Sequence, residues 1–153
     1  MSDIAEANLS PAPSALDRLA HSIARLVARH GFKRVASTAD LPLAGLAVLL
    51  LTDDPQRFPE VLDAAVILPE ALHSLGLTLS RLVADPGVSA ALAPAYGAPR
   101  PPAVVCLRDG EYQGSLSGIR DWAEYQAELA RLIQGPAQAK PIAIRIVQQG
   151  ACA

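Results

Sequence analysis

The stretch PPAVVCLRDGEYQGSLSG, residues 101–118, decides the fold. Two prolines precede an apolar run of strand length, and a second strand-like run ends in a glycine. Between the two runs stands Asp109-Gly110, a pair that strongly favours a two-residue β-hairpin turn. The stretch therefore predicts antiparallel strands over residues 102–108 and 111–118, joined by this turn.

A helix is expected directly after the hairpin. Asp121 can cap it, and Glu124 stands at the capping-box position. Its apolar residues recur at helical spacing until Gly135-Pro136 ends it. These residues are Trp122, Tyr125, Leu129, Leu132 and Ile133, and we expect the stripe to face the sheet.

An uninterrupted apolar run of strand length predicts the centre of that sheet. Residues 46–52, LAVLLLT, are uninterrupted by polar side chains until the last position, as in strands that are covered on both faces. A polar loop over residues 53–58 follows, and then a helical stretch over residues 59–76. Pro69 within that stretch either kinks the helix or starts one in its first turn.

The amino-terminal part of the domain predicts a helix and a short strand. Ser14 and Asp17 have the spacing of a capping box, and Gly31 ends the helix. Residues 32–37 are the candidate strand. The apolar positions of the helix are Leu16, Leu19, Ile23, Leu26 and Val27.

Residues 77–85 alternate as a strand does, and residues 86–97 predict a short, irregular helical connection to the hairpin. The expected order is therefore helix, strand, strand, helix, strand, helix, strand, strand, helix. This alternation predicts an α/β fold.

The composition of the whole chain excludes several classes of function. Of the 153 residues, 51% are hydrophobic and 18% are charged, and the formal net charge is only −2. A chain of this length builds one domain with a substantial core. The charge balance favours neither a nucleic-acid-binding surface nor a disordered acidic tail.

We expect a cytoplasmic protein without membrane insertion. The first fourteen residues carry no Lys or Arg and no unbroken apolar run, so they lack the parts of a secretory leader. The longest apolar run, residues 43–51, is far short of the roughly 20 residues that a membrane-spanning helix needs.

The chain is expected to divide into three parts. Residues 1–13 form a flexible arm, residues 14–135 the folded domain, and residues 136–153 a tail. Within the tail, residues 142–147 alternate as a strand does, with three isoleucines on one side. Such a strand would either lie on its own domain or pair with another chain.

Roughly residues 77–133 resemble the second half of a thioredoxin-like domain. Pro102 matches the family's cis-proline and Gly118 its late glycine, whereas the first half of the chain matches only in the order of its elements. The resemblance implies a thioredoxin-like fold, in which a central mixed β-sheet is flanked by helices on both faces. It also implies that the Pro101-Pro102 peptide bond is cis.

The thiols of thioredoxin-like enzymes have no counterpart here. Those enzymes carry Cys-x-x-Cys at the start of the helix after the central strand, where the helix dipole lowers the pKa of one thiol. Depending on how Pro69 is aligned, the equivalent positions are residues 53–57, DDPQR, or residues 61–64, VLDA. Both segments offer carboxylates and no thiol, which excludes thiol-disulfide exchange by the family's mechanism.

The segments around these positions carry a narrower resemblance. With DDPQRFPEVLDAAVILPE at 53–70 and GEYQGSLSGIRDWAEY at 110–125, the chain resembles the hydrogenase-expression accessory proteins of the HyaE/HupG/HoxO type. The resemblance implies a non-catalytic, cytoplasmic chaperone of nickel-iron hydrogenase maturation. Its implied partner is the precursor of the hydrogenase small subunit, bound at the twin-arginine leader peptide, and other hydrogenase accessory proteins are further partners that it allows.

A twin-arginine leader offers adjacent guanidinium groups followed by an apolar stretch, so its site needs paired carboxylates beside an apolar groove. The one dense acidic group of the chain follows the predicted central strand, and the proline loop at 100–102 is the second candidate place. The predicted partner-binding residues are Asp53, Asp54, Phe58, Glu60, Asp63, Arg100, Pro101 and Pro102. The carboxylates have an alternative, structural role, which is to cap the following helix and complement its dipole.

No catalytic residue, metal site or cofactor is predicted. His21, His30 and His73 have no spacing that places two of them on one helix face. The segment GSLSG at 114–118 has Leu116 where the serine of a nucleophile elbow would stand. The chain has no glycine-rich phosphate loop.

Two rival functions remain open at this point. One is a single-thiol redox enzyme of the same superfamily, for which Cys106 or Cys152 would need to be exposed and of low pKa. Cys106 lies in an apolar strand, however, and is expected to be buried as a small hydrophobic residue. The other rival is a generic thioredoxin-like protein-interaction module.

Overall fold

The computed structural model describes residues 11–138, and a mixed sheet of five strands lies at its centre. The strand order is β1 (Phe32–Arg34), β3 (Ser80–Ala84), β2 (Leu46–Leu51), β4 (Ala103–Arg108), β5 (Glu111–Ser117). β2 pairs in parallel with β3 and in antiparallel orientation with β4. The strand expected over residues 142–147 lies outside the described residues.

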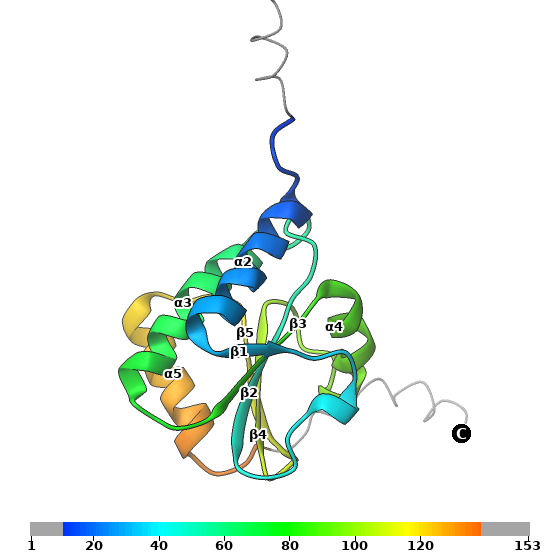
Figure 1. Ribbon diagram of the computed structural model, residues 1–153. Coiled ribbons are helices and arrows are strands. Elements are labelled where there is room, and N and C mark those ends of the chain that lie inside the picture. The colour runs from blue at the N-terminus through cyan, green and yellow to red at the C-terminus, as the bar shows by residue number, and fades with distance from the viewer. Residues whose placement is uncertain (1–10, 139–153) are drawn as a thin grey trace, which may run out of the picture.

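Helices cover both faces of this sheet, as expected (Figure 1). One face packs against α2 (Ala15–His30), α3 (Glu60–Leu75) and α5 (Trp122–Gln134). The opposite face packs against α4 (Pro86–Leu92) and the 3-10 helix η2 (Ala93–Tyr96). A further 3-10 turn, η1 (Thr38–Asp40), connects β1 to β2.

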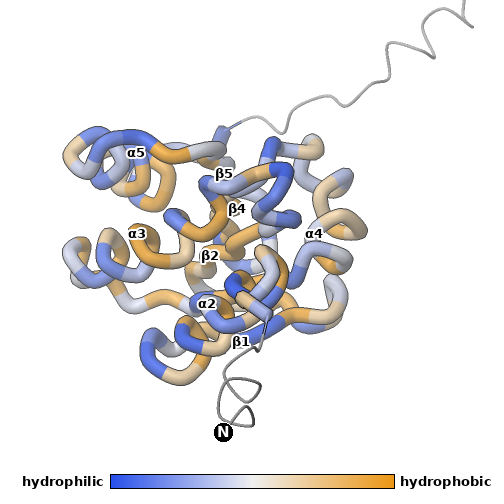
Figure 2. Tube along the Cα trace, turned by 90° about the horizontal axis from the view of Figure 1, so that it is seen from above, coloured by the Kyte–Doolittle hydropathy of each residue, from blue (hydrophilic) through white to orange (hydrophobic). Residues whose placement is uncertain are grey.

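β2 contributes to the core on both sides of the sheet. Val48 and Leu50 belong to the apolar cluster under α2, α3 and α5, whereas Ala47, Leu49 and Leu51 belong to the cluster under α4. Each of these side chains is at most 1% exposed. Apolar residues accordingly gather along β2 and β4 in the middle of the molecule (Figure 2), and the prediction of a central strand is confirmed.

The ends of the elements follow the predicted capping chemistry. Ser14 and Asp17 form a full capping box, and Gly31 ends α2 in the left-handed conformation at φ 73°. Asp121 caps α5 by accepting a hydrogen bond from the backbone N–H of Glu124 at 3.0 Å. Pro69 lies inside α3 and does not start a helix, which settles the alternative that the sequence leaves open.

Three apolar side chains are more exposed than the sequence predicts. Leu16 and Val27 are 50% and 40% exposed, because the buried face of α2 is narrower than its apolar stripe. Trp122 is 46% exposed, so the expectation that it faces the sheet is wrong. It is the first residue of α5, at the end of the helical layer, whereas Tyr125 and the apolar residues after it are buried.

Gln138 and Arg120 occupy backbone groups of the edge strand β5. Gln138 donates its backbone N–H to the carbonyl of Gln113 at 2.6 Å, and its side-chain oxygen accepts from the N–H of Ser115 at 3.3 Å. Arg120 Nη1 donates to the carbonyl of Ser117 at 2.6 Å. These bonds occupy backbone groups that an edge strand otherwise offers to a further strand.

A buried polar cluster fixes the carboxyl end of β2. The backbone N–H of Thr52 donates to Ser89 Oγ at 2.8 Å, and Thr52 Oγ1 donates to the carbonyl of Ala84 at 2.6 Å. Ser89 Oγ donates to the same carbonyl at 3.0 Å. The cluster ties the ends of β2 and β3 to α4, so it holds in place the loop that follows Thr52.

Replacing Ser89 with alanine should destabilise the protein by about 1–3 kcal/mol, because the buried N–H of Thr52 loses its acceptor. The free energy of unfolding in urea measures this. Ser80→Ala, at an exposed serine of β3, is the matched control and should change it by no more than about 0.5 kcal/mol. Equal effects of the two substitutions would contradict the role assigned to the cluster.

Candidate functional site

The loop after β2 holds two of the predicted carboxylates in local hydrogen bonds. Asp53 Oδ1 accepts from the backbone N–H of Asp54 at 2.6 Å, and Asp54 Oδ1 accepts from the N–H of Gln56 at 2.9 Å. Asp53 also lies 4.0 Å from the guanidinium of Arg57. Turn formation therefore accounts for these two carboxylates, and they do not cap α3, whose N-cap Pro59 has no side-chain cap.

Two guanidinium groups lie near the ring of Phe58. The Cζ atoms of Arg57 and Arg100 are 5.4 Å and 5.3 Å from the centroid of its ring, within the range of cation–π attraction. Phe58 itself is half-buried against the core under α3. The loop after β2 and the loop before β4 therefore meet here.

The Pro101-Pro102 peptide bond is cis, as predicted. Pro102 is buried, and its carbonyl accepts from the N–H of Gly118 at 2.8 Å. Pro101 lines a hollow of about 170 Å³ together with Asp53 and Pro99. As a proline it has no N–H, so its backbone can accept a hydrogen bond from a bound chain but cannot donate one.

Glu60 and Asp63 lie in the first turn of α3, where their charges complement the helix dipole. Both are exposed, and among residues 11–138 no ion pair within 4.0 Å involves either of them. Asp63 faces α2 across a hollow that it shares with Asp17. The predicted partner-binding residues thus divide between a corner at Phe58 and the amino-terminal turn of α3.

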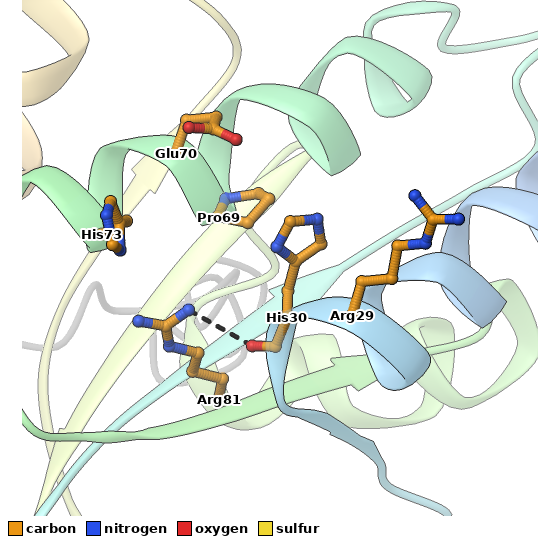
Figure 3. A pocket seen from close by; sticks show the side chains of 6 residues that line it. All are labelled: Arg29, His30, Pro69, Glu70, His73 and Arg81. Carbon is orange, nitrogen blue, oxygen red and sulfur yellow. Dashed lines mark hydrogen bonds between the residues drawn. The ribbon is translucent and has the colours of Figure 1, made fainter.

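Sequence reasoning missed a second charged place, at the carboxyl ends of α2 and α3. A hollow of about 320 Å³ is lined there by His30 from α2, by His73 from α3 and by Arg81 from β3 (Figure 3). Arg81 Nη1 donates to the carbonyl of His30 at 3.2 Å. The histidines are 43 residues apart in the sequence, so no local spacing could have indicated that they are neighbours.

No part of the chain that the structure describes holds three or more His, Cys, Asp or Glu side chains arranged to bind a metal ion. Within the same residues, none of the helices has both the length and the apolar composition to span a bilayer.

Cys106 is fully buried in β4, as the sequence predicts. Burial raises the pKa of its thiol to about 11, although the charge of Arg108 acts in the opposite direction. At neutral pH the thiol is therefore protonated, and it lacks the exposure that a nucleophile needs. Cys152 lies outside the described residues.

The chain is similar to a family of proteins named for hydrogenase expression. The model of the family described as "Hydrogenase-1 expression protein HyaE" matches residues 22–125. The hydrogenase expression/formation protein HupG of Bradyrhizobium diazoefficiens is 36% identical over 129 residues, which cover 79% of this chain and 87% of that protein. The protein HoxO of Cupriavidus necator, of the same description, is 36% identical over 149 residues, which cover 94% and 92%.

Solved structures show the fold. Reduced desulfothioredoxin from Desulfovibrio vulgaris Hildenborough matches with a TM-score of 0.53 and 22% identity, covering 63% of this chain and 94% of its own. A mutant thioredoxin from Halobacterium salinarum matches with a TM-score of 0.51 and 20% identity, covering 73% and 96%. The predicted thioredoxin-like fold is thereby confirmed.

Cys106 should react with a thiol reagent only when the protein unfolds. In a Cys152→Ser variant at pH 8, a thiol of pKa about 11 is almost entirely protonated and is shielded by the core. Labelling by 5,5′-dithiobis(2-nitrobenzoic acid) should therefore be negligible in buffer and complete in urea. Rapid labelling of the native variant would show that Cys106 is available as a nucleophile.

Proposed function

Because the chain belongs to the HyaE family of hydrogenase expression proteins, we propose that it is a non-catalytic, cytoplasmic accessory chaperone of nickel-iron hydrogenase maturation. It binds the precursor of the hydrogenase small subunit, at the twin-arginine leader peptide. The leader's guanidinium groups pair with the carboxylates that begin α3.

The free carboxylates at the start of α3 are the observation that supports this most. Glu60 and Asp63 lie three residues apart on one helix, so their side chains project from the same side of it. Both are exposed and neither has an ion-pair partner among the described residues. Two unpaired carboxylates at this spacing suit two neighbouring guanidinium groups.

The corner at Phe58 has a different role in the proposal. Its ring already carries the guanidinium groups of Arg57 and Arg100, which repel further cations. Asp53 and Asp54 shape the loop, and Pro101 offers a carbonyl acceptor with an apolar ring beside it. This corner is therefore suited to contact backbone or apolar parts of the precursor, and not the leader's arginines.

The rival function of a single-thiol enzyme has less support from the structure. Cys106 has the wrong exposure and the wrong pKa for it, which leaves only Cys152. A generic interaction module is distinguished by its affinities. It should bind the small-subunit precursor with its leader and the same precursor without its leader equally well.

Reversing the charges of Glu60 and Asp63 together, by substitution with lysine, should weaken binding of a synthetic small-subunit leader peptide about tenfold or more at 50 mM salt. A single exposed ion pair contributes well under about 1 kcal/mol, but reversal of two replaces attraction with repulsion. Fluorescence anisotropy of the labelled peptide measures the change. Asp53 and Asp54 are unsuited to this test because their carboxylates hold the loop.

The matched control is the double variant Glu111→Lys, Glu124→Lys, which changes the net charge equally at exposed positions on β5 and α5. It should bind as the wild type does. Wild-type binding should also weaken between about 50 mM and 500 mM salt, as the Debye length falls from roughly 14 to 4 Å. Equal affinity for the precursor with and without its leader would rule the proposal out.

A further inference from the structure

A furrow runs between α2 and α3 from their beginnings to their ends. Three hollows make it up: the first and second share Ser22 and Val66, and the second and third share His30 and Glu70. The two helices run in the same direction. Asp17 and Asp63, near their amino-terminal ends, line one hollow, and His30 and His73, near their carboxyl-terminal ends, line another. Sixteen residues of helix measure about 24 Å, which sets the length of this α2/α3 furrow.

The end of the furrow where the helices begin is the apolar one. Its hollow has a volume of about 620 Å³, roughly twice that of the hollow at the other end. Leu62 and Val66 line it from α3 and Pro13 from the chain before α2. The side chain of Val66 is 63% exposed, although α3 buries its other apolar residues wholly or partly. Covering this wall would remove apolar surface from water.

Side-chain charge is distributed unequally along the furrow. Three carboxylates stand at or next to the apolar end, namely Asp17, Glu60 and Asp63, with Arg18 as their counterpart. Three arginines stand toward the opposite end, namely Arg25, Arg29 and Arg81, with Glu70 as their counterpart. The two helix dipoles oppose this pattern, but each amounts to only about half a charge, so an acidic and a basic end remain.

Of the two carboxylates that line the apolar hollow, Asp17 and Asp63, only Asp63 has no partner among the described residues. Asp17 accepts a hydrogen bond from the N–H of Ser14 at 3.1 Å, as part of the capping box of α2. Asp63 makes no hydrogen bond or ion pair of this kind among the described residues, and it lies one turn before Val66 on the same helix. A cationic group on Asp63 therefore has the apolar hollow directly beside it.

We propose that the apolar end of the α2/α3 furrow holds the apolar stretch of the leader peptide, while the leader's paired arginines lie on Glu60 and Asp63. This inference rests on the proposed function and adds the second half of its site. The occupant is defined by chemistry, as a segment in which cations are followed directly by apolar side chains. In the reverse direction the leader's arginines would lie beside Arg25 and Arg29, which repel them, so the leader lies in one direction only.

The test compares two leader peptides on a set of variants. One peptide has the natural sequence, and the other keeps the arginines but has serine in place of the apolar stretch. Val66→Asp and Val66→Lys should each weaken the natural peptide about tenfold, because either charge removes the apolar contact. Neither should change the affinity for the serine peptide by more than about threefold. Leu43→Asp, at a loop residue that is 84% exposed and lies outside the furrow, should leave both affinities unchanged.

The outcomes separate this inference from the proposed function. If the natural peptide binds the wild type and both Val66 variants equally well, the furrow is not the apolar subsite, while leader binding itself stands. If Val66→Asp strengthens binding and Val66→Lys weakens it, only charge acts at this position, and the apolar contact is refuted. If the natural peptide does not bind the wild type, the proposed function fails and this inference with it. Circular dichroism confirms that each variant is folded. If a charged variant does not fold, Val66→Ala replaces it in the test and should lose less affinity for the natural peptide.

The direction of binding has its own measurement. A photoreactive benzoylphenylalanine placed directly after the arginines should crosslink near Val66, and one placed at the end of the apolar stretch should crosslink near Arg25 or Arg29. Peptide mapping of the crosslinked protein locates the sites. The reverse assignment would overturn the proposed direction.

Discussion

The fold depends on the burial of β2 from both sides. Its side chains point alternately into two separate apolar clusters, and its pairing with β3 on one edge and β4 on the other places it at the centre of the sheet. Because Thr52, at the end of this strand, is only 1% exposed, its polar atoms need partners within the protein. Ser89 and the carbonyl of Ala84 provide them, and the chain can leave the sheet there as a polar loop. The hydrogen bonds that satisfy Thr52 at the end of β2 thus also fix the position of the candidate site.

The same constraint explains why the loop after β2 and the loop before β4 meet. β2 and β4 are paired along their whole length, with Leu51 opposite Ala103, so the residues that follow one strand lie beside those that precede the other. Phe58 packs against the core at this place, and its ring lies within cation–π range of Arg57 and Arg100. Where the resemblance to thioredoxin-like enzymes aligns their two thiols, this chain has a corner at which two arginines lie beside Phe58 and two carboxylates are engaged in turns.

Local sequence patterns predicted most of the fold, because helix caps, tight turns and buried strands depend on interactions and burial preferences of residues close together in the sequence. The capping box at Ser14, the Asp109-Gly110 turn and the apolar run of β2 each depend on residues close together in the sequence, and each is confirmed. The misjudged exposure of Trp122 has the opposite cause, since it depends on where the neighbouring layer ends. The roles of the site residues likewise depend on the folded structure and not on sequence spacing alone. Sequence spacing could group the carboxylates, but it could not show that Asp53 and Asp54 are used by the loop.

The charge of each part decides which part suits which piece of a cationic, apolar peptide. At the corner, Arg57 and Arg100 lie near the ring of Phe58 and the nearby carboxylates are engaged in turns, so an arriving guanidinium is repelled by two like charges. In the first turn of α3, Glu60 and Asp63 are exposed and have no ion-pair partner among the described residues. Beside Asp63, Leu62 and Val66 form an apolar wall. This distribution of charge supports a cation site on the face where α2 and α3 pack together, and not at the proline loop.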